Sequence, residues 1–495
     1  MKTLKKPLSI LLALMMILSV FAVLPLTVNA VGGKVGDCDW EFDEATGKLS
    51  ITGVGDPGRN CPWSEYESQI TSVYIGNGAT ATPTNIGRNI YVDNVTSVEI
   101  GDSVKKIGWN TFCECTKLTT LKIGTGVKEI QDEAFGNCKA LTSLTIPGNV
   151  TTIGEDAFCE CKKLATVKFG SGVKKIGKDS FYNCYALKKI SFPDSVTDIK
   201  GSAFLRCLNL EKVSIGKGVK YIGSAAFSYC KSMKAFSVNK SNAKYSSASG
   251  SLFNKKKTSL LCYASGRTAK KYTVPKTVKT IASLAFSVAN KVNEINTNKV
   301  VTIKNEAFYN CGALKKVVLG DSLKKMENDA FAFNNKLANI SIGKNLNLKA
   351  NNFGYCEKVR RITVSKKNKN MYVSKYGLYN KKAKSLVAAF NLKLKPNFTV
   401  KSGITSVTAD AFYSSQYLKS LVLPKSVKKV GDEIFDCCKK ITKLTVYNSK
   451  LDLSYSYLGV DGDEEHIRTN ITVVCYKGSE AAKYAKSCGF TVKYL

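Results

Sequence analysis

The sequence predicts an α/β-type repeat solenoid: a parallel stack of strands with short helical or 3₁₀ turns, a period of about 23 residues and capped ends. Twelve phenylalanines mark the period: Phe112, Phe135, Phe158, Phe181, Phe204, Phe227, Phe286, Phe308, Phe331, Phe353, Phe412 and Phe435. Consecutive members are 22 or 23 residues apart, except at two gaps of 59 residues. A unit this short cannot bury its apolar side chains alone, so about thirteen units must stack to form a core.

One repeat, residues 141–163, shows how each element is predicted. Leu144 and Ile146 alternate with polar neighbours, which is the pattern of a half-buried strand. Pro147-Gly148-Asn149 is a turn signal. Asp156 lies two residues before the phenylalanine, and seven repeats have an acidic residue at this place. Acidic residues favour the N-terminal turn of a short helix or 3₁₀ segment, which we therefore expect there.

The first thirty residues predict a signal peptide. Three lysines precede an apolar run at 8–24, and Val28-Asn29-Ala30 supplies small residues for cleavage. The alternative is an N-terminal membrane anchor, since the run approaches the shortest length that spans a bilayer. Cleavage is favoured because the segment after the run is short and ends in small residues. The mature chain has no further long apolar run, hence no transmembrane segment, and is expected to be secreted, either free or associated with the cell surface.

The mature chain divides into a solenoid and two caps. Each gap of 59 residues holds a 36-residue insertion, and both insertions contain an Asn-Lys-Lys turn between apolar stretches, which predicts a hairpin. The expected organisation is a signal peptide at 1–30, a β-hairpin cap at 31–69, a solenoid at 70–469 with hairpin insertions near 237–272 and 363–398 and an irregular acidic loop at 451–469, and a strand–helix–strand cap at 470–495.

The repeat has a recognisable pattern. Cys115-Thr-Lys-Leu118-Thr-Thr-Leu121-Lys-Ile123, followed by Ala134-Phe135-Gly136-Asn137-Cys138, resembles the BspA-type leucine-rich repeat, and Tyr476-Lys477-Gly478-Ser479 resembles an ending common in that family. The resemblance covers residues 35–495. It implies a β-rich leucine-rich repeat solenoid in a secreted or cell-surface bacterial protein, some relatives being adhesins for host matrix proteins or other cells. It supplies no catalytic residues.

Nine cysteines stand three residues after the phenylalanine: Cys115, Cys138, Cys161, Cys184, Cys207, Cys230, Cys311, Cys356 and Cys438. Three repeats have Ala289, Asn334 or Ser415 there instead, so this is a packing position. Stacked side chains are about 4.8 Å apart, whereas a disulfide needs Cβ atoms about 3.8 Å apart. We therefore predict a structural column of buried free thiols. Export permits disulfides, so pairing of cysteines 38 with 61 and 475 with 488 in the caps stays open.

Metal, cofactor and enzyme sites are not expected. Cys113 and Cys159 lie two repeats apart, about 10 Å along the stack, too far for one zinc ion. Calcium is a minor hypothesis for Asp461, Asp463 and Glu465, because the loop lacks the Gly and the Glu of an EF-hand. The single histidine, His466, lies in the same polar loop. Without one unrepeated constellation of reactive groups, an enzyme is only a minor alternative.

The net charge of +36, or +33 after loss of the leader, is arranged in a column. Lysines recur seven residues before the phenylalanine: Lys105, Lys128, Lys174, Lys220, Lys279, Lys324 and Lys428. Stacking would bring like charges to about 4.8 Å, inside the Debye length. One interpretation is a polyanion-binding column for acidic glycans or teichoic acids, with nucleic acid disfavoured by export. The other, which we favour, is a solvated edge that maintains solubility.

Aromatic residues in the insertions are candidate anchors for a partner: Tyr245, Phe253, Tyr372, Tyr376 and Tyr379. Aromatic side chains are frequent hot spots of interfaces. The alternative, which we favour, is that they pack the insertions onto the solenoid. The first functional hypothesis is extracellular protein–protein adhesion, the second is electrostatic binding of acidic polymers, and an enzyme is the minor alternative.

Overall fold

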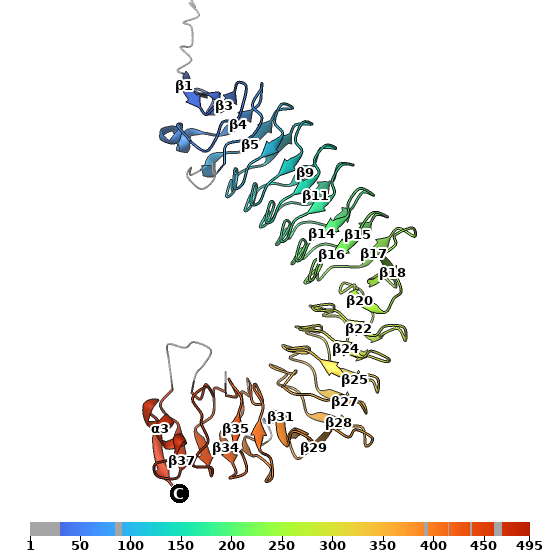
Figure 1. Cartoon of the computed structure of the whole chain (residues 1–495), viewed down its shortest axis with the longest axis vertical. Helices are drawn as coiled ribbons and strands as arrows, with labels where there is room; N and C mark the ends of the chain where they lie inside the picture. The colour runs from blue at the N-terminus through green and yellow to red at the C-terminus, as the bar shows by residue number, and fades with distance from the viewer. Residues whose placement is uncertain (1–29, 85–91, 391–394, 414, 436–437, 460–467) are drawn as a thin grey trace, which may run out of the picture.

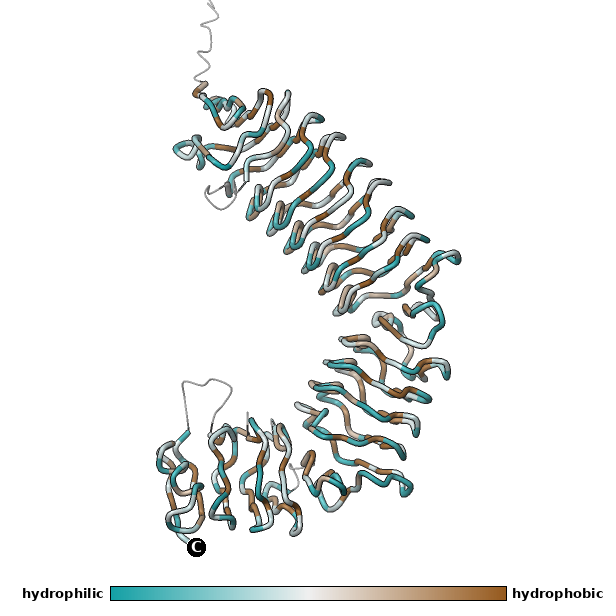
Figure 2. Tube along the Cα trace, in the orientation of Figure 1, coloured by the Kyte–Doolittle hydropathy of each residue, from teal (hydrophilic) through white to brown (hydrophobic). Residues whose placement is uncertain are grey.

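The chain is a curved stack of coils (Figure 1). The computed structural model describes residues 30–84, 92–390, 395–413, 415–435, 438–459 and 468–495. Each regular coil contributes one strand to a main sheet and a two-residue strand to a second sheet, and both sheets are parallel. Polar and apolar positions alternate within the coils along the whole arc (Figure 2). The predicted parallel strand stack is confirmed.

The first block of coils begins with an antiparallel cap. Its main strands are β1 (Ala30–Val35), β2 (Cys38–Asp43), β3 (Lys48–Thr52), β4 (Ser72–Ile75), β5 (Ser97–Ile100), β7 (Thr120–Ile123), β9 (Ser143–Thr145), β11 (Thr166–Lys168), β13 (Lys189–Ser191), β15 (Lys212–Ile215) and β17 (Ala235–Val238). Its second sheet is β6 (Lys106–Ile107), β8 (Glu129–Ile130), β10 (Thr152–Ile153), β12 (Lys175–Ile176), β14 (Asp198–Ile199) and β16 (Tyr221–Ile222). Two 3₁₀ helices, η1 (Ser64–Gln69) and η2 (Val92–Asn94), lie near the cap.

The second and third blocks each open with an insertion. The second block has β18 (Tyr245–Ala248), β19 (Ser251–Asn254), β20 (Ser259–Cys262), β22 (Thr280–Ile281), β24 (Thr302–Ile303) and β26 (Lys325–Met326) in one sheet, and β21 (Lys271–Thr273), β23 (Glu294–Asn296), β25 (Lys316–Leu319), β27 (Asn339–Ile342) and β28 (Arg361–Val364) in the other. The third has β29 (Met371–Ser374), β30 (Gly377–Asn380), β31 (Ser385–Ala389), β33 (Ser406–Val407) and β35 (Lys429–Val430), beside β32 (Asn397–Thr399), β34 (Ser420–Leu423), β36 (Lys443–Val446), β37 (Thr472–Cys475) and β38 (Thr491–Tyr494), with helix α3 (Glu480–Ser487) at the end.

A column of stacked phenyl rings fills the core. Phe135 and Phe158, for example, lie 5.3 Å apart with 6° between their planes. Beneath the main sheet, Leu144 pairs in register with Val167 of the next coil, and both are buried. The buried apolar residues form three clusters, which meet at the two insertions. The insertions therefore divide one solenoid into three core segments.

Turns surround each phenylalanine where a short helical or 3₁₀ segment was predicted. The acidic residue two positions earlier lies in the left-handed region, with φ of 54° at Glu133 and 52° at Asp156. Its amide donates to the next coil, as from Glu133 N to Glu155 O at 2.8 Å. The position is therefore a tight turn that hydrogen-bonds between coils, and Asp is among the residues that tolerate this conformation.

Each insertion contains three antiparallel strands rather than a single hairpin. The last of the three strands, β20 or β31, also pairs in parallel with the following coil. Tyr263 N donates to Ala285 O at 2.7 Å and Ala389 N to Ala411 O at 2.9 Å, as the phenylalanine amides do in regular coils. Tyr263 and Ala389 thus occupy the ring position of two coils that counting phenylalanines does not reveal.

Candidate binding surfaces

The seven lysines of the predicted column lie along one edge of the second sheet, and all are exposed. In the first block, Lys128 N donates to Lys105 O at 2.8 Å and Thr151 N to Lys128 O at 2.8 Å, so these positions stack in register. Threonines 151 and 197 occupy the alternate coils before Lys174 and Lys220. The expected 4.8 Å spacing of charges therefore applies only to Lys105 and Lys128, and most other neighbours are two coils apart.

The lysines on this edge differ from lysines on the main sheet in whether an acidic side chain lies beside them. On the main sheet, Lys122 lies 2.5 Å from Glu99 and Lys316 lies 2.9 Å from Glu294. Among the described residues, no acidic side chain pairs with any lysine of the column. Within the described residues the column is thus a line of seven exposed lysines without an ion pair, although the charge of Lys105 is one of the influences that lower the pKa of Asp102.

Most of the aromatic candidate anchors in the insertions pack against the rest of the fold. Tyr245, Phe253 and Tyr379 are buried, so their rings cannot reach a partner on the surface. The hydroxyl of Tyr245 accepts a hydrogen bond from Ile222 N at 2.8 Å, which caps the edge of β16. Tyr372 is half-buried and stacks on Tyr379 at 5.2 Å, and Tyr376 is half-buried beside the third core cluster. Three of the five candidate anchors are therefore excluded by burial.

The nine column cysteines are buried, and eight thiols point at a phenylalanine carbonyl of the preceding coil. The distance from Cys184 Sγ to Phe158 O is 3.3 Å. Asn334 makes the same contact with its amide, at 2.9 Å from Phe308 O. Burial raises the pKa of Cys311 and of Cys356 to about 12. The position thus requires a small side chain and favours one that can donate to this carbonyl, which explains why Asn can replace Cys, whereas Ala289 shows that the donor can be lost.

The other cysteines do not form a metal cluster in the described part of the chain. The Sγ atoms of Cys113 and Cys159 each lie 3.3 Å from the point where a Cβ of Gly136 would stand, so they are closer than the predicted 10 Å. In the caps, Cys38 Sγ lies 3.5 Å from Gly55 O, and both Cys475 and Cys488 are free thiols. The acidic loop proposed for calcium, with Asp461, Asp463, Glu465 and His466, lies outside the described residues.

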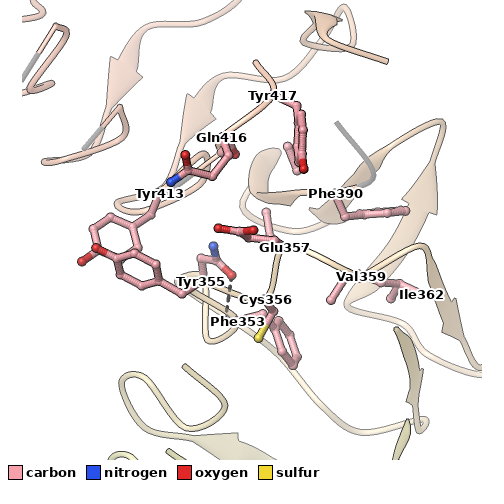
Figure 3. A pocket seen from close by; sticks show the side chains of 14 residues that line it. Phe353, Tyr355, Cys356, Glu357, Val359, Ile362, Phe390, Tyr413, Gln416 and Tyr417 are labelled. Carbon is pink, nitrogen blue, oxygen red and sulfur yellow. Dashed lines mark hydrogen bonds between the residues drawn. The ribbon is translucent and has the colours of Figure 1, made fainter. Parts of the chain in front are cut away.

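A pocket opens at the second insertion (Figure 3). It offers about 60 Å³ for the centres of water-sized molecules. Its inner wall is apolar and includes Phe353, Ile362 and Phe390, whereas tyrosines and Glu357 form the outer wall. In Figure 3 the Glu357 carboxylate is seen between the side chains of Tyr417 above and Phe353 below.

The pocket arises from the sequence of β31. Tyr263 in the first insertion continues the stack of rings, with its centroid 4.7 Å from that of Phe286. Ala389 at the same place has no ring and lines the pocket together with Ala388. Sequence reasoning missed this site because the repeat was traced by phenylalanine. Aligning the two insertions would have revealed the alanine at a ring position.

The repeats of this chain match those of a known protein family. The family model described as BspA-type leucine-rich repeat region, with six copies, matches residues 84–207, 151–266, 256–382 and 388–458. The chain belongs to this family. The BspA-type repeat accounts for most of the solenoid, including both insertions. No curated protein matches the chain.

Solved structures with a similar fold come from several bacteria. A leucine-rich cell surface protein of Faecalibacterium prausnitzii is 22% identical, with 84% of this chain and 94% of that chain covered and a TM-score of 0.47. A leucine-rich repeat protein of Eubacterium ventriosum is 19% identical, with 83% and 90% covered and a TM-score of 0.45. The pneumococcal vaccine antigen PcpA is 20% identical, with 94% and 98% covered and a TM-score of 0.45. Within the described ranges, no helix of this BspA-type protein is long and apolar enough to cross a membrane.

Proposed function

We propose that this BspA-type protein is a secreted or surface-associated adhesion protein that binds another protein through its main sheet. The supporting observation is the long face of outward side chains on that sheet. In the first block many of these are small or basic and exposed, as at Thr120, Ser143 and Thr145, although Glu99 adds an acidic residue beside Lys122. In the second block the face is hollowed into a groove of about 560 Å³ that includes Asn296, Ser341 and Thr363. A long groove with many hydrogen-bonding groups suits an extended protein surface.

The apolar run at 8–24 and the family support an extracellular location for this activity. Leucine-rich repeat families are typically binding scaffolds, which agrees with the expectation that the protein is not an enzyme. No metal or cofactor is part of the proposal.

The test is a binding screen of the exported chain against extracellular matrix proteins and acidic glycans at low and high salt. We expect a protein ligand whose binding survives high salt. Ser341→Trp, which blocks the groove, should weaken binding at least tenfold, whereas Thr151→Trp on the edge of the second sheet should leave it unchanged. Equal loss in both variants, or binding to glycans alone, would contradict a protein site on the main sheet.

A second function is supported by the exposed lysine column, which forms no ion pair among the described residues. We propose, as the alternative, that this edge binds an acidic polysaccharide such as an acidic glycan or teichoic acid. Replacing Lys105, Lys128, Lys174 and Lys220 by Gln should then abolish binding of the polymer and flatten its salt dependence. The matched control replaces Lys122 and Lys316 on the main sheet, which already pair with glutamates. Polymer binding that persists at high salt would refute the electrostatic mechanism.

A further inference from the structure

We infer that the pocket at the second insertion binds a primary alkylammonium group, the chemical group of a lysine side chain or of a free amine. The first observation is its size. The space of about 60 Å³ is roughly four times what one water molecule requires. That volume suits a short alkyl chain with one head group and excludes a sugar polymer or a nucleotide.

The second observation is the charge of the surroundings. Between Asp329 and Asp410 the sequence has sixteen lysines and arginines and one acidic residue, Glu357. In the described part of the chain Glu357 forms no ion pair, although Lys358 and Arg360 are close in sequence. Among the described residues this carboxylate therefore has no ionic partner, and it is exposed at the pocket, where a cation from outside can reach it.

The third observation is the aromatic wall. Tyr355, Tyr413 and Tyr417 line the pocket, and Figure 3 shows Tyr417 above the Glu357 carboxylate and Phe390 to its right, whereas the rings of Tyr355 and Tyr413 pack on each other at the left. An ammonium group is attracted to the face of an aromatic ring. The ring of Tyr417 already attracts one, because Lys440 Nζ lies 5.5 Å from its centroid.

The geometry assigns a place to each part of the ligand. The alkyl chain lies against Phe353, Ile362 and Ala389, where burial of apolar surface favours binding. The ammonium group then remains at the opening, where it donates to Glu357 and lies on the side of Tyr417. A neutral ligand of the same shape would gain the burial of its alkyl chain but not the interaction with the Glu357 carboxylate.

The first insertion also has a hollow at its junction, the place where its last strand rejoins the solenoid. There the acidic residue is paired, unlike Glu357. A hollow of about 320 Å³ borders β20, and its single acidic residue is Glu327. Glu327 lies 2.9 Å from Lys325 and 3.3 Å from Lys304, so the protein already neutralises it. Of these two hollows, only the one at the second insertion has a carboxylate without an ion pair among the described residues.

The experiment measures binding of n-butylammonium to the full exported chain by saturation-transfer NMR, with n-butanol as the uncharged control. We expect saturable binding of n-butylammonium and at least tenfold weaker binding of n-butanol, the loss expected for one charged hydrogen bond. Glu357→Gln should weaken n-butylammonium binding by about tenfold, and Glu65→Gln, at an exposed carboxylate in the N-terminal cap, should not change it. Equal binding of the two ligands, or unchanged binding by Glu357→Gln, would overturn the inference.

A second variant tests the pocket itself. Ala389→Phe places a ring in the cavity and should abolish binding of n-butylammonium while the chain stays folded, which a melting curve checks. If that variant does not fold, Glu357→Gln still decides the inference. A lysine blocked at both ends identifies the source of the ammonium group. If the blocked lysine binds, the ligand is a side chain of a partner protein. If it is excluded while n-butylammonium binds, the ligand is a free amine. Saturable binding that persists in a folded Ala389→Phe variant would refute the assigned site.

Discussion

The two insertions share one scaffold and differ in how they rejoin the solenoid. In the first, the side-chain amide of Asn242 donates to Gly216 O at 2.8 Å, and Lys255 Nζ donates to Asn242 O at 2.6 Å. In the second, Asn368 donates to Gly343 O at 2.8 Å, and Lys381 donates to Asn368 O at 3.0 Å. The same two polar contacts therefore hold the backbone of both insertions in the same path.

The core positions of the two insertions are different. Tyr263 in the first continues the ring stack, and Cys262 Sγ lies 3.7 Å from Phe227 O. The corresponding residues in the second are Ala389 and Ala388, which can neither stack nor donate. The comparison shows that hydrogen bonds from side chains to backbone carbonyls are common to both insertions, whereas the ring position can be emptied to form a pocket. The following predictions test this distinction.

The largest effect is expected from Tyr263→Ala, which gives the first junction the residue of the second. Loss of a buried aromatic ring and the resulting cavity should reduce the free energy of unfolding by about 3–5 kcal/mol. Urea unfolding measures the loss, and hydrogen exchange should locate it in β20 and β22 rather than in β31 and β33.

Tyr263→Phe is the matched control for that variant. The buried hydroxyl of Tyr263 has no hydrogen-bond partner among the described residues, so its removal should leave stability equal or raise it by about 1 kcal/mol. A cost below about 1 kcal/mol for Tyr263→Ala would show that the ring column does not stabilise the junction.

The next effect concerns the edge of β16. Tyr245→Phe removes the hydroxyl that accepts from Ile222 N, which leaves a half-buried amide without this partner. We expect a loss of about 1–2 kcal/mol, measured by urea unfolding. The second insertion has Met371 at this place, and Met371→Leu should change stability by less than about 1 kcal/mol. Equal costs would mean that the hydroxyl has no role in capping the edge.

The fold was predictable because the repeat is regular. The period of Phe135, Phe158 and Phe181, with alternating residues such as Leu144 and Ile146, specifies stacked parallel strands. The left-handed turn at Asp156 was not predictable from an acidic residue, because the same residue type also favours the start of a helix.

The candidate sites were less predictable, since they depend on exceptions to the repeat. A lysine column can be read from the sequence, but whether each lysine has an acidic partner depends on side-chain positions across coils, as for Lys122 and Glu99. Burial of Tyr245 depends on how the insertion packs against β16. The pocket at Ala389 requires knowing that this alanine occupies a ring position, which the hydrogen bond to Ala411 O establishes.

A smaller effect, a gain in stability, is expected from Ala389→Phe. This variant adds a ring at the second insertion, whereas Tyr263→Ala removes one at the first. Filling the pocket should raise the free energy of unfolding by about 1 kcal/mol, visible as a higher melting temperature. The control is Ala307→Val at a buried position that does not line the pocket, which adds volume elsewhere in the core and should not stabilise. A lower melting temperature for Ala389→Phe would show that the pocket cannot admit a ring in the orientation of the column.

The smallest effect at neutral pH is expected from Cys262→Ala, which copies Ala388 into the first junction. Losing the weak hydrogen bond to Phe227 O should cost about 1 kcal/mol. Burial raises the pKa of Cys262 from 9.0 to about 12, so the folded state keeps this thiol protonated after the unfolded state has ionised. The thiol's contribution is therefore complete below pH 9 and is lost as the pH rises from 9 to 12. Urea unfolding at pH 7, 9 and 10.5 should show the difference between wild type and Cys262→Ala shrinking with pH, and a difference that grows would contradict a buried, protonated thiol.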